Sequence, residues 1–224
     1  MACIRPLILM GIIYGQDDHY FINDLEIDGN ESISKNEILF IVRQRPPNFF
    51  FRRPKFDPRL LRLDALTLKN YYYSKGFLDV VINESYHIMD NSNKNKFVDI
   101  LYKVVEGKQY HLSKVHINGN DLISKKKITK ILGLKIDSPY NPVRLNDNLY
   151  LLENEYQNLG KLFATITVKD EIKDSVEIKI DIDEGKYIYI NNTRIEKKGN
   201  IDSAIVIREL NYDSGDLFSK IKVD

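Results

Sequence analysis

A repeat of roughly 80 to 90 residues is the feature that most constrains what this chain folds into. The first copy spans residues 20–107, the second spans residues 108–185, and a partial third copy spans residues 186–224. The copies share helix caps, helix ends and strand alternation, so several kinds of local signal agree with one another. The sequence therefore predicts a tandem array of small modules.

Each copy opens with a short strand of alternating apolar residues that ends in Gly-Asn, at Leu25–Asn30 and at Val115–Asn120. Alternation places the apolar side chains on one face of a sheet, and the Gly-Asn pair tolerates the sharp turn that follows. Ser34 and Ser124 then precede apolar residues at helical spacing. We expect both serines to cap short helices.

A longer second helix follows in each copy. Asp57–Pro58 and Asn141–Pro142 are each an N-cap residue followed by proline at the first helical position. Gly76 and Gly160 are expected to end these helices. The predicted buried stripes are Leu61, Ala65, Leu68 and Tyr72 in the first copy and Leu145, Leu149, Leu152 and Tyr156 in the second.

A hairpin closes each copy with Glu-Gly, at Glu106–Gly107 and Glu184–Gly185. The predicted first arms carry Leu78, Val80 and Ile82 in one copy and Leu162, Ala164 and Ile166 in the other. The predicted return arms carry Val98, Ile100, Tyr102 and Val104, and Val176, Ile178, Ile180 and Ile182. The predicted fold class is α+β, with tandem βααββ modules that each hold a three-stranded mixed sheet with two helices on one face.

Small sheets of this kind have exposed edges, which soluble proteins usually protect. Successive modules that each offer an unpaired edge predict the binding of extended polypeptides by β-strand addition. The first hairpin arms, near residues 80–86 and 166–172, are the expected edges. The predicted client-contacting residues are Val80, Ile82, Glu84, Tyr86, Ile166, Val168 and Asp170.

The N-terminal residues 1–18 are predicted to be a signal peptide, with Arg5 as the positive charge and Pro6–Tyr14 as the apolar core. A first β-strand or a disordered tail is the alternative. The single cysteine, Cys3, excludes disulfide scaffolds and cysteine-ligated zinc from the body of the chain, and it suits an oxidising compartment.

Catalytic and metal-binding motifs are missing from the sequence, so we expect neither an enzyme nor a cofactor. His111 and His116 differ by an odd number of positions, which places them on opposite faces of one strand and argues against a shared metal. The net charge of +1 argues against a nucleic-acid binder. The glycine-rich loop of KH RNA-binding domains is also missing between the two helices of the first copy.

Basic and aromatic residues alternate between Arg43 and Arg62. This stretch has three interpretations: a long loop whose phenylalanines pack beneath its own helices, a contact with an anionic membrane surface or a partner, or stacking on nucleic acid. The candidate membrane or partner residues are Phe49, Phe50, Phe51, Arg52 and Arg53. Lys125–Lys127 are expected to form a solvated helix face.

These segments together resemble polypeptide-transport-associated (POTRA) domains of the outer-membrane β-barrel assembly superfamily. The resemblance rests on the strand openings, the Glu-Gly closures, and the segments Gly76–Asp79 and Gly160–Phe163. Val206–Leu210 with Ser214–Phe218 is similar to the first helix of a barrel-proximal POTRA domain, and residues 52–57 resemble the interhelical loop of an early one.

The resemblance implies a periplasmic scaffold attached to the bacterial outer membrane. Its expected partners are unfolded outer-membrane proteins, accessory lipoproteins and the membrane itself through a C-terminal barrel. The chain ends at Asp224, before the second helix expected of the third copy, so the barrel is expected outside these residues. The arm of a two-partner-secretion transporter and a purely structural adaptor remain as alternatives.

Overall fold

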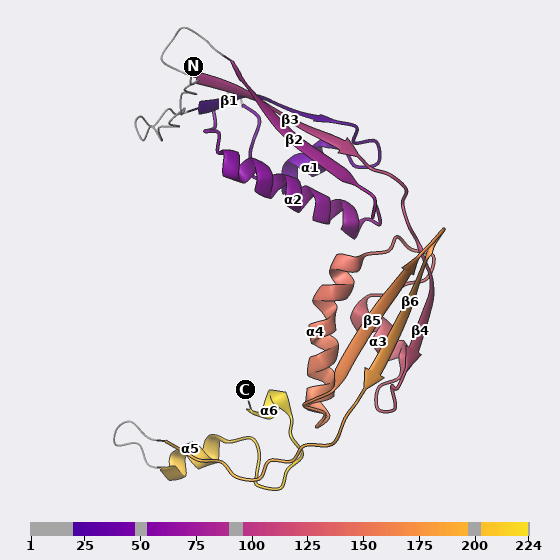
Figure 1. Ribbon diagram of the computed structural model, residues 1–224. Helices are drawn as coiled ribbons and strands as arrows, with labels where there is room; N and C mark the ends of the chain where they lie inside the picture. Colours follow the sequence, from indigo (N-terminus) through magenta and orange to yellow (C-terminus); the bar gives the residue numbers. More distant parts are fainter. Residues whose placement is uncertain (1–19, 48–52, 90–95, 197–202, 224) are drawn as a thin grey trace, which may run out of the picture. The chain divides into compact units, whose positions relative to one another are not determined.

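The computed structural model describes residues 20–47, 53–89, 96–196 and 203–223 (Figure 1). By spatial proximity the chain divides into two compact units, Met1–Leu66 with Ile82–Val104 and Thr67–Val81 with Val105–Asp224. The predicted signal peptide, residues 1–18, lies outside the described residues. Among the helices that the structure describes, none combines the length and the apolar character needed to cross a membrane.

The order of elements follows the predicted repeat. The first copy contains β1 (Tyr20–Asp28), α1 (Lys35–Ile41), α2 (Pro58–Ser74), β2 (Val81–Met89) and β3 (Lys96–Val105). The second copy contains β4 (Leu112–Asn118), α3 (Lys125–Leu132), α4 (Pro142–Asn158), β5 (Thr165–Ile172) and β6 (Val176–Asp183). Two short helices follow, α5 (Ser203–Glu209) and α6 (Lys220–Val223).

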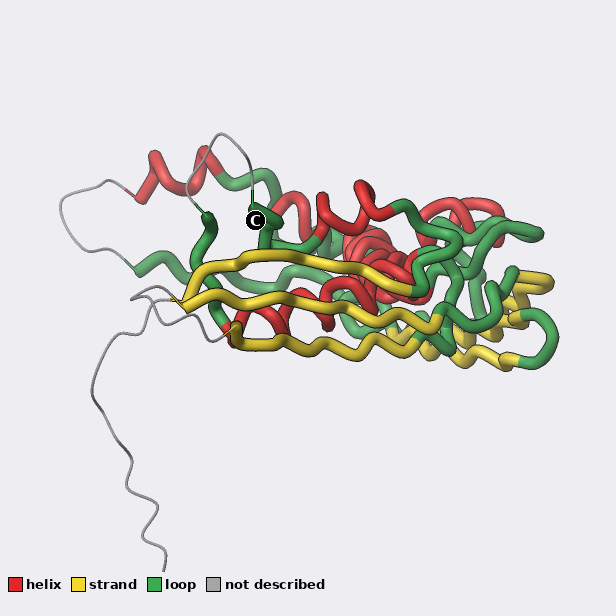
Figure 2. The backbone as a smooth tube through the Cα atoms, turned by 90° about the horizontal axis from the view of Figure 1, so that it is seen from above, coloured by secondary structure: helices red, strands yellow, loops and turns green. Residues whose placement is uncertain are grey.

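Each copy forms a three-stranded sheet, in the order β1-β3-β2 and β4-β6-β5. The first strand of each copy runs parallel to the last, as β1 does to β3 and β4 to β6. β5 pairs with β6 in antiparallel orientation, so the second sheet is mixed. In that copy α3 and α4 both lie on one face of the sheet (Figure 1), and Figure 2 colours the strands of the chain yellow and its helices red. The predicted α+β module is therefore confirmed.

Local capping explains where the helices begin and end. The side chains of Ser34 and Ser124 accept hydrogen bonds from backbone N–H groups one turn into α1 and α3, as predicted. Asn141 caps α4 in the same way. At the end of α2, the Lys75 and Phe77 N–H groups both donate to the Tyr72 carbonyl, at 3.0 and 3.1 Å, which satisfies a carbonyl of the last helical turn.

The core of the second copy consists of the predicted apolar stripes. Ile178 and Ile180 on β6 are fully buried against Leu152 and Tyr156 of α4, and Leu149 packs beside them with partial exposure. In the first copy the predicted residues of α2 and β3 are buried as well. Burial of about 25 cal/mol per Å² of apolar surface makes these stripes the main source of stability.

A buried carboxylate holds the helices of the first unit to its sheet. Asp64 of α2 is 1% exposed and accepts hydrogen bonds from the backbone N–H groups of Arg43 and Gln44, at 2.8 and 2.9 Å. The Tyr102 hydroxyl on β3 donates to the same carboxylate at 3.4 Å. The chain that leaves α1, the helix α2 and the strand β3 therefore meet at one side chain.

Three expectations about where elements begin were wrong. The first hairpin arms begin later than expected, because residues 77–80 and 161–164 form turns before β2 and β5. In the third copy the described residues near Tyr187 make a single bridge, Tyr189 to Leu217, instead of a strand. The second helix that was expected beyond the chain end begins at Lys220.

Buried tyrosines predict a loss of stability at alkaline pH. Burial and the carboxylates of Asp170 and Glu184 raise the pKa values of Tyr140 and Tyr156 above the ordinary 10.0. Above that pH the unfolded chain loses tyrosine protons that the folded chain retains, so each tyrosine should remove up to about 1.4 kcal/mol of stability per pH unit. Denaturant unfolding on both sides of this pH measures the slope. Tyr140→Phe should make it shallower, and an unchanged slope in that variant would contradict the assignment.

Candidate functional site

The outer edges of β2 and β5 are the candidate binding surface. Each strand is the last in its sheet, and β3 or β6 is its only neighbour among the described strands. The register pairs β5 with β6 along its whole length, from Thr165 with Asp183 to Ile172 with Val176. The other side of each strand therefore presents backbone N–H and C=O groups along the sheet edge.

The opposite edge of each sheet is covered by the segment that precedes the second helix. At β4, the Leu112 N–H donates to the Ser138 carbonyl at 3.0 Å, and the Asp137 N–H donates to the Leu112 carbonyl at 2.8 Å. At β1, the Ile22 N–H donates to the Pro54 carbonyl at 2.8 Å. The same covering in both copies leaves β2 and β5 as the more open edges.

The predicted client-contacting residues differ in where the structure places them. Val80 was wrongly assigned to the edge, since it lies before β2 and is 2% exposed. The others lie within β2 or β5, but Ile166 and Val168 pack their side chains against the core. Glu84 and Ile82 are half-buried.

Two of the predicted residues already have aromatic partners. The Tyr140 hydroxyl donates to the Asp170 carboxylate at 3.1 Å, and the Tyr86 ring lies 4.8 Å from the Phe56 ring, centroid to centroid. These side chains hold the inner face of the edge strands to the segments before the second helices. Tyr86 and Asp170 would therefore support the binding of a chain at the edge by keeping β2 and β5 in place.

Sequence reasoning missed the outward-facing side chains of both edges. Alternation along a strand places them at the odd-numbered positions. They are exposed in the structure and include Val81, Asn83, Ser85 and His87 on β2 and Thr165, Thr167, Lys169 and Glu171 on β5. The alternating pattern separates the odd-numbered from the even-numbered positions of each strand. It does not show which of the two sets faces the helices.

The two edges differ in how they are protected. Lysine and proline are residues that natural proteins use to blunt sheet edges. β5 carries Lys169 with the neighbouring charges of Asp170 and Glu171, whereas β2 (Val81–Met89) has neither lysine nor proline. β2 is therefore the less protected edge, and charge on β5 would make that edge more selective.

Most of the basic and aromatic stretch falls outside the candidate edges. Phe49, Phe50, Phe51 and Arg52 lie outside the described residues. Arg53 donates to the Asn23 side chain at 3.1 Å, and its guanidinium lies 4.5 Å from the centre of the Phe97 ring. Arg59 pairs with Asp57, and the hydrogen bond from Arg59 lowers the pKa of that carboxyl.

A small exposed apolar surface lies beside this stretch on α2. Leu63 and Leu66 are 47% and 56% exposed, and together with Pro58, Arg59 and Arg62 they line a depression of about 460 Å³. The arginines place positive charge around the leucines.

Among the described residues, no three His, Cys, Asp or Glu side chains gather in a way that would hold an ion. His116 lies on β4 with its Nε2 atom 4.0 Å from the Glu177 carboxylate, and His111 lies before that strand.

Comparison with known proteins gives one family and several relatives. The family model described as POTRA, surface antigen variable number repeat, matches residues 20–107 and 110–185. A putative outer membrane protein assembly factor of Treponema pallidum is 23% identical over 207 residues, which cover 90% of this chain and 24% of the relative. The outer membrane protein assembly factor BamA of Buchnera aphidicola is 25% identical over 195 residues, which cover 84% of this chain and 31% of the relative. The chain thus spans less than a third of the length of these two relatives.

A solved structure shares the arrangement of elements. The crystal structure of POTRA domains 3 to 5 of Haemophilus influenzae BamA matches with a TM-score of 0.61 and 18% sequence identity. The match covers 92% of this chain and 82% of that structure. It supports the fold of successive βααββ modules.

Proposed function

Because the chain belongs to the POTRA family, as the resemblance in its sequence predicted, we propose that it is a periplasmic scaffold that binds extended polypeptides along the outer edges of β2 and β5. The observation that carries this proposal is the asymmetry of the two sheets. One edge of each is covered by its own chain, and the other ends in β2 or β5.

The proposed mechanism is β-augmentation. A client strand would add to the open edge, and its backbone would exchange hydrogen bonds with β2 or β5. Each such bond contributes about 0.5–1.5 kcal/mol net, so several in a row give useful affinity without demanding a particular sequence. The outward side chains, such as Asn83 and Ser85 on β2 or Lys169 on β5, would add modest selectivity.

The proposed clients are unfolded outer-membrane β-barrel proteins. Apolar and polar side chains alternate along their strands, and an extended strand of this kind can pair with a sheet edge. Support comes from the names of the relatives, which are outer membrane protein assembly factors. Accessory lipoproteins are the proposed docking partners, and a membrane barrel in the full-length protein is the proposed attachment to the outer membrane. We propose no catalytic activity and no nucleic-acid partner. The exposed leucines and arginines of α2 are a further candidate for partner or membrane contact.

Proline substitution on β2 tests the edge. Backbone N–H groups point to alternate sides of a strand in the plane of the sheet. Asn83→Pro and Glu84→Pro therefore remove, between them, one N–H that points to the open edge (the outward N–H) and one that points to β3 (the inward N–H). The outward variant should keep its circular dichroism spectrum and lose at least about fivefold in affinity for a labelled peptide of alternating valine and threonine, measured by fluorescence anisotropy.

The other variant and a helix-surface change serve as controls. The inward proline should lower stability, because it breaks a hydrogen bond to β3. Lys125→Gln on the exposed face of α3 should change neither stability nor affinity. Unchanged peptide binding in a folded outward variant would remove β2 as the binding edge.

A structural adaptor is the alternative from a different class. A photo-crosslinking residue at Ser85 or Thr167 should form adducts with many unfolded barrel proteins if the edges bind clients. An adaptor would yield only fixed partner subunits, and a dedicated secretion arm would yield a single substrate. The pattern of adducts therefore separates the three functions.

A further inference from the structure

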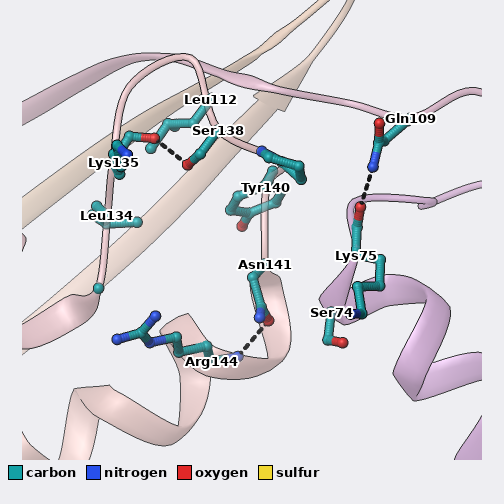
Figure 3. A pocket seen from close by; sticks show the side chains of 12 residues that line it. Ser74, Lys75, Gln109, Leu112, Leu134, Lys135, Ser138, Tyr140, Asn141 and Arg144 are labelled. Carbon is teal, nitrogen blue, oxygen red and sulfur yellow. Dashed lines mark hydrogen bonds between the residues drawn. The ribbon is translucent and has the colours of Figure 1, made fainter. Parts of the chain in front are cut away.

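A cavity of about 360 Å³ lies wholly within the second compact unit, and none of its lining residues belongs to β2 or β5 (Figure 3). Ser74 and Lys75, at the end of α2, form one side, and Asn141 and Arg144, at the start of α4, form another. The Gln109 side chain donates to the Lys75 carbonyl at 2.9 Å and joins two of the lining segments.

The charge of this cavity has one sign. Lys75, Lys135 and Arg144 all line it, and none of the lining residues is acidic. The structure gives Lys135 and Arg144 no carboxylate partner among the described residues. Lys75 lies 4.9 Å from the centre of the Tyr71 ring, an arrangement that leaves its charge in place. A cavity whose lining residues include basic side chains and no acidic ones favours an anionic ligand.

The end of α2 meets the segment before α4 at Gly76, Tyr110 and Tyr140, and we call this arrangement the first corner. The chain contains a second corner of the same kind at the end of α4. The Ile188 N–H donates to the Gly160 carbonyl at 2.9 Å, as the Tyr110 N–H does to Gly76 at 2.8 Å. The Phe218 N–H donates to the Ile188 carbonyl at 2.8 Å, just as Tyr140 does to Tyr110 at 2.9 Å. These matching bonds establish which residues correspond in the two corners.

In the second corner a side-chain oxygen occupies the position that is open in the first. The Asn158 Oδ1 atom accepts a hydrogen bond from the Ile221 N–H at 2.9 Å. The corresponding residues in the first corner are Ser74 and Val143, by the same count from Gly76 and Tyr140. The Ser74 hydroxyl is directed to the Tyr71 carbonyl at 2.6 Å, and the Val143 N–H has no acceptor among the described residues.

From this comparison we infer that the cavity between Ser74 and Arg144 binds a carboxylate of a polypeptide. The carboxylate oxygen takes the place that the Asn158 carboxamide holds in the second corner. Lys75, Lys135 and Arg144 supply the charge that a carboxylate needs and a carboxamide does not. The carboxylate comes from an acidic side chain or from a chain terminus. This site is separate from the proposed binding edges of β2 and β5 and does not depend on them.

Nuclear magnetic resonance titration of the full chain tests the site. The probes are an amidated, acetylated triglutamate peptide and a triglycine peptide with a free carboxyl terminus, each compared with its uncharged counterpart, triglutamine or amidated triglycine. The expected result is movement of the Ser138 and Val143 backbone amide signals with one or both carboxylate peptides only. The arm that responds identifies the source of the carboxylate. Equal responses to charged and uncharged peptides, or no response, would overturn the inference.

Ser74→Asn is the sharpest variant, because it should supply from within the chain the oxygen that the ligand would supply. We expect about a tenfold loss of triglutamate affinity, the equivalent of one hydrogen bond to a charged group. Lys135→Gln should weaken binding by about threefold to fivefold, while Lys130→Gln on the exposed surface of α3, outside the cavity, should not. Unaltered affinity in folded Ser74→Asn and Lys135→Gln would contradict the site. The proline variants of β2 should bind triglutamate normally, which separates this result from the test of the edges.

Discussion

Replacing Gly119 with alanine is expected to lower the free energy of unfolding of the second copy by about 3–5 kcal/mol. Gly119 has a φ of +74°, a region that costs an L-residue energy, and it lies at the turn after β4. A Cβ atom there would lie 2.0 Å from the Ile182 carbonyl oxygen and 3.1 Å from its carbon. Since that carbonyl belongs to the central strand β6, the turn has to move away from the sheet.

Gly185→Ala is the matched control within the same copy. Gly185 has a similar φ of +64°, but a Cβ atom would meet only the Phe163 carbonyl group, at 3.6 Å and beyond. Its cost should therefore be the conformational part alone, about 1–2 kcal/mol. Denaturant unfolding followed by circular dichroism measures both losses. Equal losses in the two variants would show that contact with Ile182 contributes nothing.

Asp64→Ala is expected to destabilise the first copy by about 3–5 kcal/mol, because it leaves three donors without their acceptor in a buried place. Those donors are the Arg43 and Gln44 backbone N–H groups and the Tyr102 hydroxyl. Water cannot replace the carboxylate without entering the core, since Asp64 is 1% exposed. The loss should appear as a lower denaturation midpoint of the first copy.

Two other substitutions separate the buried hydrogen bonds from helix propensity. Asp64→Asn keeps one acceptor oxygen, so it should lose less stability than the alanine variant. Asp147→Ala changes an exposed aspartate on α4 and should alter stability by less than about 0.5 kcal/mol. If Asp64→Ala were no more harmful than Asp147→Ala, the carboxylate would not be the connection between α1, α2 and β3.

Local patterns predicted the elements of the two complete copies. Ser34, Ser124 and Asn141 cap the helices that the pattern assigned to them, and the stripe from Leu145 to Tyr156 faces the core. These signals act over one or two turns of chain, so they do not depend on distant residues. The start of β2 was misjudged for a related reason. Val80 continues the alternation of the strand, but it is buried in a turn that the alternation does not reveal.

The sequence by itself determined the repeat, the βααββ order and the apolar faces, because each rests on contacts between residues that are near in the chain. Only the tertiary structure decided which edge of each sheet is covered, since the bonds from Ile22 to Pro54 and from Leu112 to Ser138 join residues far apart in sequence. It also decided that the odd-numbered side chains of β2 and β5 face outward. It likewise decided that the Asn158 side chain accepts a hydrogen bond from the Ile221 N–H at the end of α4, whereas its counterpart Ser74 bonds the Tyr71 carbonyl. Strand pairing and cavities are products of distant segments meeting in space, and no local pattern contains them.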